Sequence, residues 1–328
     1  MIDQRIGFVC KASFLAVAVG IVGSGALSPA SDAASTDFST IAVVRDGGLS
    51  VGPPNDLASL DLPAPAGDVA LSANGDRLAV AVGIPIRTYM EGIRGQVHVL
   101  DADTGALVEL TSLAPSVITG VAIDAAGDHV AFVKDYRELW LFDAGTGEST
   151  QLADTELIAP HVRGGAIFDP AFTAAGDEVL FGVVEETFQG EDDRLDNLWS
   201  VGVGGEPGEP RRLTSLEAPS SEEGWTIVRN PVGLPDASTL MALATDNVWS
   251  VAQVADDVET LGPVPPATVP VAATSDEMLF LSMNMQTLKF NLVVLELPSD
   301  GEAWEHWCEL GCTTIARNVS AAAGATLP

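Results

Sequence analysis

The sequence has few basic residues. Its 328 residues include 15 lysines and arginines against 46 aspartates and glutamates, and the formal net charge is −31. Nucleic acid recognition needs a basic surface that neutralises phosphates, and binding to anionic lipid needs clustered lysines or arginines. The composition therefore excludes a nucleic-acid-binding protein and predicts repulsion from anionic membranes. Acidity alone does not distinguish a saline habitat, a cationic partner and a solubility effect.

Long apolar runs are also scarce. The longest covers residues 12–27, follows two basic residues, and is shorter than the roughly 20 residues of a membrane span. Ser31 and Ala33 then fit the −3 and −1 positions of a cleavage site. We therefore predict that residues 1–33 are a signal peptide and that the mature chain is secreted or periplasmic, without stable membrane insertion. An uncleaved membrane anchor is the alternative.

Cysteine is rare as well. One of the three cysteines, Cys10, lies inside the predicted signal peptide, which leaves Cys308 and Cys312 in the mature chain. An even pair in an exported chain favours a disulfide between them. Metal binding together with His306 is the alternative, but zinc needs more ligands than this local cluster offers.

A repeat with a turn of glycine and aspartate runs through the rest of the chain. Three segments align directly, at residues 69–81 (VALSANGDRLAVA), 121–133 (VAIDAAGDHVAFV) and 170–182 (PAFTAAGDEVLFG). Glycine accepts the positive φ that a tight turn needs, and aspartate bonds to the turn backbone. Because apolar stretches flank each turn, each segment predicts a β-hairpin. Weaker copies occupy residues 234–244 and 272–282.

A second hairpin follows each copy of the first. Its first strand is expected at residues 96–101, 138–143, 197–201, 247–251 and 291–296. Four short strands per unit at a regular spacing are typical of a β-propeller, in which each sheet stacks on its neighbours around a ring. No segment after the signal peptide has a convincing helical period, so we predict an all-β protein.

The two ends of the mature chain complete the predicted ring. Five units begin near Gly67, Thr119, Gly165, Trp225 and Thr268. Residues 38–66 hold three more strands, residues 315–322 resemble an innermost strand, and residues 302–310 are assigned to the outermost strand of the fifth blade. Pairing the N- and C-terminal segments supplies the missing strand and removes exposed edges. We therefore predict one domain, residues 34–328, folded as a six-bladed β-propeller with four antiparallel strands per blade.

The repeat resembles that of TolB-type, WD-repeat-like propellers. The resemblance rests on a strand, the Ala-x-Gly-Asp turn, a Leu-Trp strand and a Leu-Thr segment, most clearly at residues 170–177 and 212–216. It covers nearly all of residues 38–328, although the turn differs from the family's usual Ser-Pro-Asp-Gly. The resemblance implies a ring of the kind that serves as a periplasmic protein-interaction module or as a gating domain on peptidases.

No set of residues in the sequence converges on a catalytic site. Residues 48–52 (GLSVG) match G-x-S-x-G, but Pro53 and Pro54 follow directly and oppose the helix that a nucleophile elbow needs. We therefore expect a non-enzymatic module without a cofactor. We expect it to be a monomer that binds an unidentified protein or small ligand.

One long loop is the strongest candidate for the partner contact. It covers residues 88–95, is longer than its counterpart in the next unit, and carries Tyr89, Met90 and Ile93. Long loops on a rigid scaffold are where binding usually takes place. The sequence therefore predicts an exposed contact at these three side chains.

A hydrolase is the second functional hypothesis. Lactonase- or esterase-like six-bladed propellers hold Ca²⁺ in the central channel through carboxylates from several blades, and Asp124 and Asp169 lie near innermost strands. Glu191, Asp192 and Asp193 are a further weak candidate for Ca²⁺, which prefers dense oxygen ligands. Their spacing does not match an EF-hand, and a solvated connection between strands is the simpler interpretation.

Overall fold

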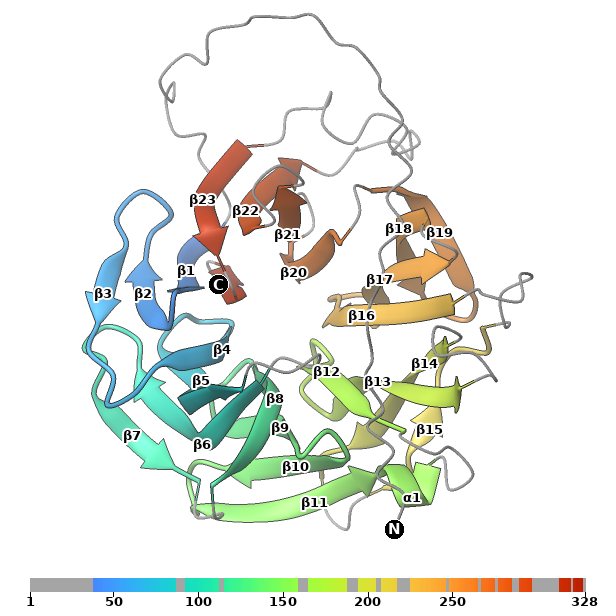
Figure 1. The fold of residues 1–328 in the computed structure, drawn as a ribbon, viewed down its shortest axis with the longest axis horizontal. Coiled ribbons are helices and arrows are strands. Elements are labelled where there is room, and N and C mark those ends of the chain that lie inside the picture. The colour runs from blue at the N-terminus through green and yellow to red at the C-terminus, as the bar shows by residue number, and fades with distance from the viewer. Residues whose placement is uncertain are drawn as a thin grey trace, which may run out of the picture. The chain divides into compact units, whose positions relative to one another are not determined.

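Apolar alternation and Gly-Asp turns build mostly antiparallel strands throughout the described part of the chain (Figure 1). The computed structural model describes residues 38–86, 92–111, 115–158, 165–187, 194–204, 208–216, 225–245, 248–264, 267–274, 277–284, 289–296, 313–319 and 321–326. All of them belong to one unit, Thr36–Pro328. The predicted signal peptide lies outside the described residues and stays a prediction. Within the described ranges, no helix is long and apolar enough to cross a membrane.

The strands form four sheets. The first contains β1 (Phe38–Arg45), β2 (Gly48–Gly52), β3 (Ala58–Leu60) and β24 (Ala321–Thr326). The second contains β4 (Ala66–Leu71), β5 (Arg77–Ile86), β6 (Gly92–Asp101), β7 (Leu107–Leu110), β8 (Ser116–Ile123), β9 (His129–Lys134), β10 (Glu138–Asp143) and β11 (Glu148–Asp154), followed by the short helix α1 (Thr155–Ile158).

The third and fourth sheets continue the same pattern. The third contains β12 (Ile167–Phe172), β13 (Glu178–Thr187), β14 (Arg194–Gly202), β15 (Arg211–Arg212), β16 (Trp225–Gly233), β17 (Thr239–Thr245), β18 (Val248–Val254) and β19 (Val258–Pro263). The fourth contains β20 (Val269–Ala273), β21 (Glu277–Asn284), β22 (Lys289–Glu296) and β23 (Thr313–Val319). Each eight-stranded sheet consists of two antiparallel meanders of four strands, joined through β6–β8 or β14–β16.

Six strands are innermost, namely β4, β8, β12, β16, β20 and β24 (Figure 1). Each contacts the next in this order, and β24 contacts β4. Alanines recur along them, for example Ala70, Ala122 and Ala171, and these face a shared cavity. Small side chains permit the close approach of several strands to one point.

The first and last strands of the described residues meet in the first sheet, where β24 pairs with β1 in antiparallel register. The prediction assigned this pairing to residues 315–322. It was right for Ala321 and Ala322, which pair with Val44 and Val43, and wrong for residues 315–319. Instead, β23 pairs with β22 as the outermost strand, the place predicted for residues 302–310. Ala316 of β23 packs into a core cluster with Leu292. The small residues of 321–326, which are alanine, glycine and threonine, suit the crowded inner position instead.

Hydrophobic packing joins each sheet to its neighbours. One core cluster combines Val133 and Leu139 of the second sheet with Val179 and Phe181 of the third. Another combines strands β1, β21, β22 and β23 of the first and fourth sheets. A single four-stranded meander cannot cover both of its faces, so its stability depends on these neighbours.

Candidate functional site

An irregularity recurs along five innermost strands. The antiparallel register shifts once in each of β4, β8, β12, β16 and β20. Asp68, Asp169 and Asn230 lie inside the shifts of β4, β12 and β16, respectively. Each lies four residues before the residue whose carbonyl oxygen accepts the hydrogen bond that closes the next turn. Asp169 and Asn230 have positive φ angles of 49° and 45°. Because bulges re-aim side chains, equivalent positions in three meanders present polar groups toward the centre.

Two cavities extend along the inner strands from these positions. The smaller, of about 330 Å³, is lined mainly by alanine, valine and proline. The larger, of about 1220 Å³, adds aromatic side chains to its wall. Four residues line both cavities and form what we call the belt: Asp68, Asp169, Asn230 and Ala322. The belt therefore separates the small cavity from the large one.

Asp68 has no cationic partner among the ion pairs of the described residues. One carboxylate oxygen accepts a hydrogen bond from the N–H of Val69 at 2.9 Å, and the other accepts one from the N–H of Val121 in β8 at 2.9 Å. Burial raises the pKa of Asp68 to about 6, against the effect of these two hydrogen bonds, and nearby Asp169 adds to the rise. The carboxylate thus links two inner strands in an environment that disfavours its charge.

Asp169, by contrast, has a cationic neighbour. Its Oδ2 accepts a hydrogen bond from the N–H of Asn230 at 3.1 Å and lies 3.9 Å from Nε of Arg229. Nη1 of Arg229 lies 3.6 Å from Oδ2 of the fully buried Asp196. The guanidinium lies over the ring of Phe168, 4.2 Å from its centroid. On this side of the large cavity, Arg229 therefore forms ion pairs with two aspartates and also lies over an aromatic ring.

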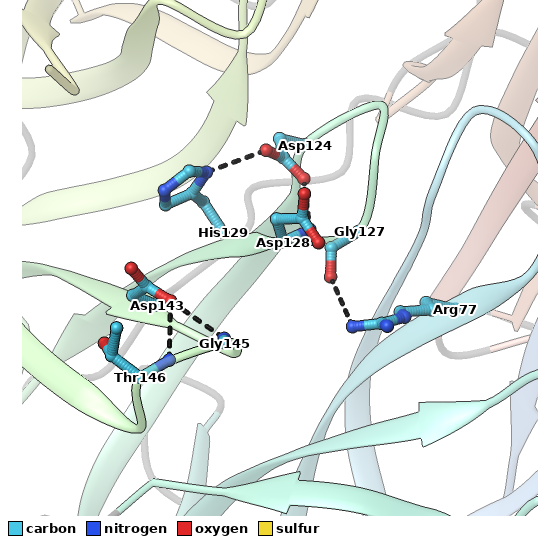
Figure 2. A network of polar contacts seen from close by, with 8 residues as sticks. All are labelled: Arg77, Asp124, Gly127, Asp128, His129, Asp143, Gly145 and Thr146. Atoms are coloured by element: carbon cyan, nitrogen blue, oxygen red, sulfur yellow. Dashed lines mark hydrogen bonds and ion pairs between the residues drawn. The ribbon is translucent and has the colours of Figure 1, made fainter.

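Asp124 lies in a hairpin turn, as Figure 2 shows. Its Oδ1 accepts a hydrogen bond from the N–H of Asp128 at 2.8 Å, and its Oδ2 lies 2.9 Å from Nδ1 of His129. Arg77, at the start of β5, donates to the carbonyl of Gly127 in the same turn at 3.3 Å. Of the two channel carboxylates expected from the sequence, only Asp169 lines the cavities, while the oxygens of Asp124 close the β8–β9 turn.

The predicted partner contact is corrected at Ile93. Its side chain is only 3% exposed and belongs to the core, so it forms no exposed contact. The reason is its close packing on β4, where a Cβ on Gly67 would lie 2.0 Å from Cγ1 of Ile93. The remaining predicted site residues lie outside the described residues and stay predictions: Tyr89, Met90, Glu191, Asp192, Asp193, Cys308 and Cys312.

The belt offers oxygen acceptors and negative charge. Within the part of the chain that the structure describes, no group of three or more His, Cys, Asp or Glu is placed to hold a metal ion. Asp68, Asp169 and the amide of Asn230 remain as polar groups, with the positive charge of Arg229 close to Asp169. Such an arrangement suits a ligand that donates hydrogen bonds and carries a single positive charge.

The sequence interpretation missed Asp68, Arg229 and Asn230. A signal for two of them exists. Asp68 and Asp169 directly precede the aligned segments 69–81 and 170–182, and Asn230 occupies the equivalent position four residues before the weaker copy 234–244. A polar residue repeated at one position of an apolar inner strand needs a reason beyond packing. Arg229 has no such repeat signal.

Sequence comparison finds no relative, since no family model and no curated protein matches the chain. Solved structures do match. One is the crystal structure of a nidogen/laminin complex, with a TM-score of 0.54 and 10% identity over 88% of this chain and 98% of that chain. Another is the tricorn protease, with a TM-score of 0.54 and 11% identity over 86% of this chain but only 30% of the protease chain.

A third match is the crystal structure of a mitotic checkpoint complex, with a TM-score of 0.50 and 13% identity over 85% of this chain and 76% of that chain. The structural neighbours are β-propeller proteins, and the chain has a β-propeller fold. At these identities the likeness extends to the fold alone.

Proposed function

We propose that this chain is an exported, non-enzymatic β-propeller of six blades that binds a protein or small ligand at its large central cavity. The observation that carries the proposal is the cavity of about 1220 Å³, whose wall combines apolar and aromatic side chains with the few polar groups of the belt. Concave sites with this composition are the usual binding sites of folded domains. Arg229 lies 3.9 Å from Asp169 in this wall and offsets part of the negative charge there.

The six-bladed ring is supported by two features of the described strands. The innermost strands contact one another in cyclic order, and β24 pairs with β1 from the other end of the chain. The repeat also resembles that of TolB-type propellers. A closed ring would hold the belt rigidly, and rigid placement of polar groups lowers the entropic cost of binding.

Export is proposed on the apolar segment 12–27 and the small residues that follow it. We expect mass spectrometry of the native protein to find an N-terminus close to Ala34, and thiol titration of the denatured, unreduced protein to find Cys308 and Cys312 oxidised. An intact Met1 would overturn the export proposal. Two free thiols would overturn the disulfide while leaving export in place.

Photo-crosslinking tests whether the large cavity binds a partner. Tyr136 lines this cavity, whereas Ser59 lies on the outer strand β3 and is exposed. We expect p-benzoylphenylalanine at position 136 to give a discrete adduct in the envelope or secreted fraction, and the same group at position 59 to give none. Adducts only from position 59, or from neither position, would contradict binding at this cavity.

The lactonase- or esterase-like hydrolase with Ca²⁺ in the channel has one observation in its favour. Two carboxylates and one amide, from Asp68, Asp169 and Asn230, line both cavities. Ca²⁺ takes about six to eight oxygens, however, and Arg229 places a positive charge beside Asp169. Stoichiometric Ca²⁺ binding together with ester or lactone hydrolysis would replace the binding module with this alternative.

A further inference from the structure

We propose that the belt binds the ammonium group of a primary amine that enters through the large cavity. This inference rests on the proposed binding function and names its ligand chemistry. The amine can be a free molecule or the side chain of a lysine on a partner protein. Both present the same compact cation on an aliphatic stem.

The position of the belt makes it the end of the entrance path. Asp68, Asp169 and Asn230 line the large cavity and the small one, so they stand where the two meet. The wall of the large cavity carries aliphatic and aromatic side chains, among them Ile86 and Trp249, beside these oxygens. An apolar passage that ends at polar acceptors fits a slender stem with a charged head.

Of the two carboxylates of the belt, Asp169 has a cation beside it and Asp68 has none among the described residues. Arg229 lies beside Asp169 and Asp196, but no lysine or arginine of the described residues pairs with Asp68. Among the described residues, the carboxylate of Asp68 accepts hydrogen bonds from the backbone N–H groups of Val69 and Val121. Burial disfavours its ionised form, so at neutral pH the empty belt holds a carboxylate that a cation would stabilise.

The geometry favours an ammonium over other cations. A divalent metal ion would be repelled by Arg229 twice as strongly as a single charge, and it would need more oxygens than the belt presents. A guanidinium binds best when both carboxylate oxygens face it in parallel, but each oxygen of Asp68 already accepts a backbone N–H from a different residue. A compact ammonium needs only one free direction on each acceptor.

Binding should be coupled to the ionisation of Asp68. The pKa of its carboxyl is about 6, so about one molecule in ten carries the charge at pH 5 and nearly all carry it at pH 7.5. An ammonium that requires the charged form should therefore bind about tenfold more weakly at pH 5 than at pH 7.5. Exposed carboxylates elsewhere on the acidic surface would not produce this particular pH dependence.

Isothermal titration calorimetry of the mature protein tests the proposal with two probes. The probes are n-pentylamine, which represents a free amine, and Nα-acetyl-lysine-N-methylamide, which represents a lysine in a protein; 1-pentanol is the neutral control. We expect one saturable site for an amine at pH 7.5, binding about tenfold weaker at pH 5, and none for pentanol. A preference for the lysine probe would indicate a protein partner, and a preference for pentylamine would indicate a free amine.

Variants separate the belt from general acidity. Asp68→Asn should abolish saturable binding while retaining the near-ultraviolet circular dichroism of the folded chain, and Asp103→Asn, at an exposed turn outside both cavities, should bind as the wild type does. Should Asp68→Asn fail to fold, Asp169→Asn takes its place and should weaken binding at least tenfold.

Three outcomes would overturn the proposal: no saturable amine binding, unchanged binding in the belt variants, or Ca²⁺ binding that amines do not displace. If amines fail but position 136 still crosslinks to a partner, only this inference falls. If both fail, the proposed binding function falls with it.

Discussion

At the scale of single residues, the carboxyl of Asp68 dominates the chemistry of the cavity. It occupies a bulge on an apolar strand, accepts a hydrogen bond from the next inner strand, and faces Asp169 without a cation of its own among the described residues. Proteins keep such unfavourable groups mainly where they serve a function, because a neutral residue would give a more stable fold. Stability measurements can therefore detect the cost of this charge directly.

The first prediction concerns the pH dependence of that cost. The pKa of Asp68 is raised from its ordinary 3.8 to about 6, so the native state holds this proton more tightly than the unfolded chain. Its ionisation costs about 3 kcal/mol above pH 6, and the cost disappears as pH falls below the unfolded value. We expect Asp68→Asn to raise the melting temperature relative to wild type more at pH 8 than at pH 4. A difference that is the same at both pH values would show that the charge is not the cause.

A second residue-scale prediction concerns a buried threonine. Thr214 is 2% exposed; its Oγ1 accepts the N–H of Leu198 at 2.9 Å and donates to Oδ1 of Asn197 at 2.8 Å. Valine has the same shape but removes both hydrogen bonds. Oδ1 of Asn197 still accepts the N–H of Leu216 at 2.9 Å, so the main cost is the lost partner of the buried N–H of Leu198, about 1–3 kcal/mol. We expect Thr214→Val to lower the free energy of unfolding in urea accordingly. The control Thr150→Val, at an exposed position of strand β11, should change it by less than about 0.5 kcal/mol.

At the scale of elements, the close packing of strand β13 against a side chain of β12 helps to shape the wall of the large cavity. Phe168 of β12 pairs with Gly182 of β13, where a Cβ would lie 2.1 Å from a ring carbon, and the guanidinium of Arg229 lies 4.2 Å from the ring centroid. Phe168 and Arg229 both line the large cavity, so the packing of this ring helps to fix the cavity wall. A methyl group on the glycine would force the ring to move.

The third prediction follows from this stack. Gly182→Ala should cost about 1–3 kcal/mol of stability, because the ring of Phe168 must move out of its packed position. Gly202→Ala is the matched control, since a Cβ there meets nothing within 4 Å, and it should be neutral or slightly stabilising. Urea unfolding of both variants decides the matter. Equal effects would mean that the stack is not tightly packed.

The hairpins were predictable because their signals are local. The predicted segments 69–81, 121–133 and 170–182 correspond to β4–β5, β8–β9 and β12–β13, with Gly75, Gly127 and Gly176 at positive φ in the turns. A glycine, an aspartate and alternating apolar residues are enough to specify such a unit. The formation of these hairpins therefore does not depend on contacts with distant parts of the chain.

At the scale of the whole molecule, the sequence is less informative because the relevant contacts are distant. Segment 321–326 lacks the alternation that identifies a strand, and its partner β1 lies at the other end of the chain. The belt is equally hard to predict from the sequence, because Asp68 and Asp169 come from strands β4 and β12, and a complete meander, β8–β11, lies between these strands in the sequence. Only the packing of successive meanders around one centre brings these residues together.

The last prediction tests whether the chain depends on this long-range pairing. Strand β24 covers one edge of β1, and Ala323 is buried in a core cluster with residues of β1, β2, β4 and β5. Deleting residues 321–328 would leave the N–H and C=O groups of β1 that face β24 unpaired, although the edge that pairs with β2 remains, and would uncover apolar side chains on both sides of the gap.

We expect this deletion to lower the melting temperature by at least about 5 °C and to produce oligomers or aggregates in size-exclusion chromatography with light scattering. Deleting only residues 327–328, beyond the end of β24, is the matched control and should leave a monomer of unchanged stability. A monomeric 321–328 deletion with the wild-type melting temperature would mean that pairing of the chain ends does not hold the inner strands together. The belt would then need another source of rigidity.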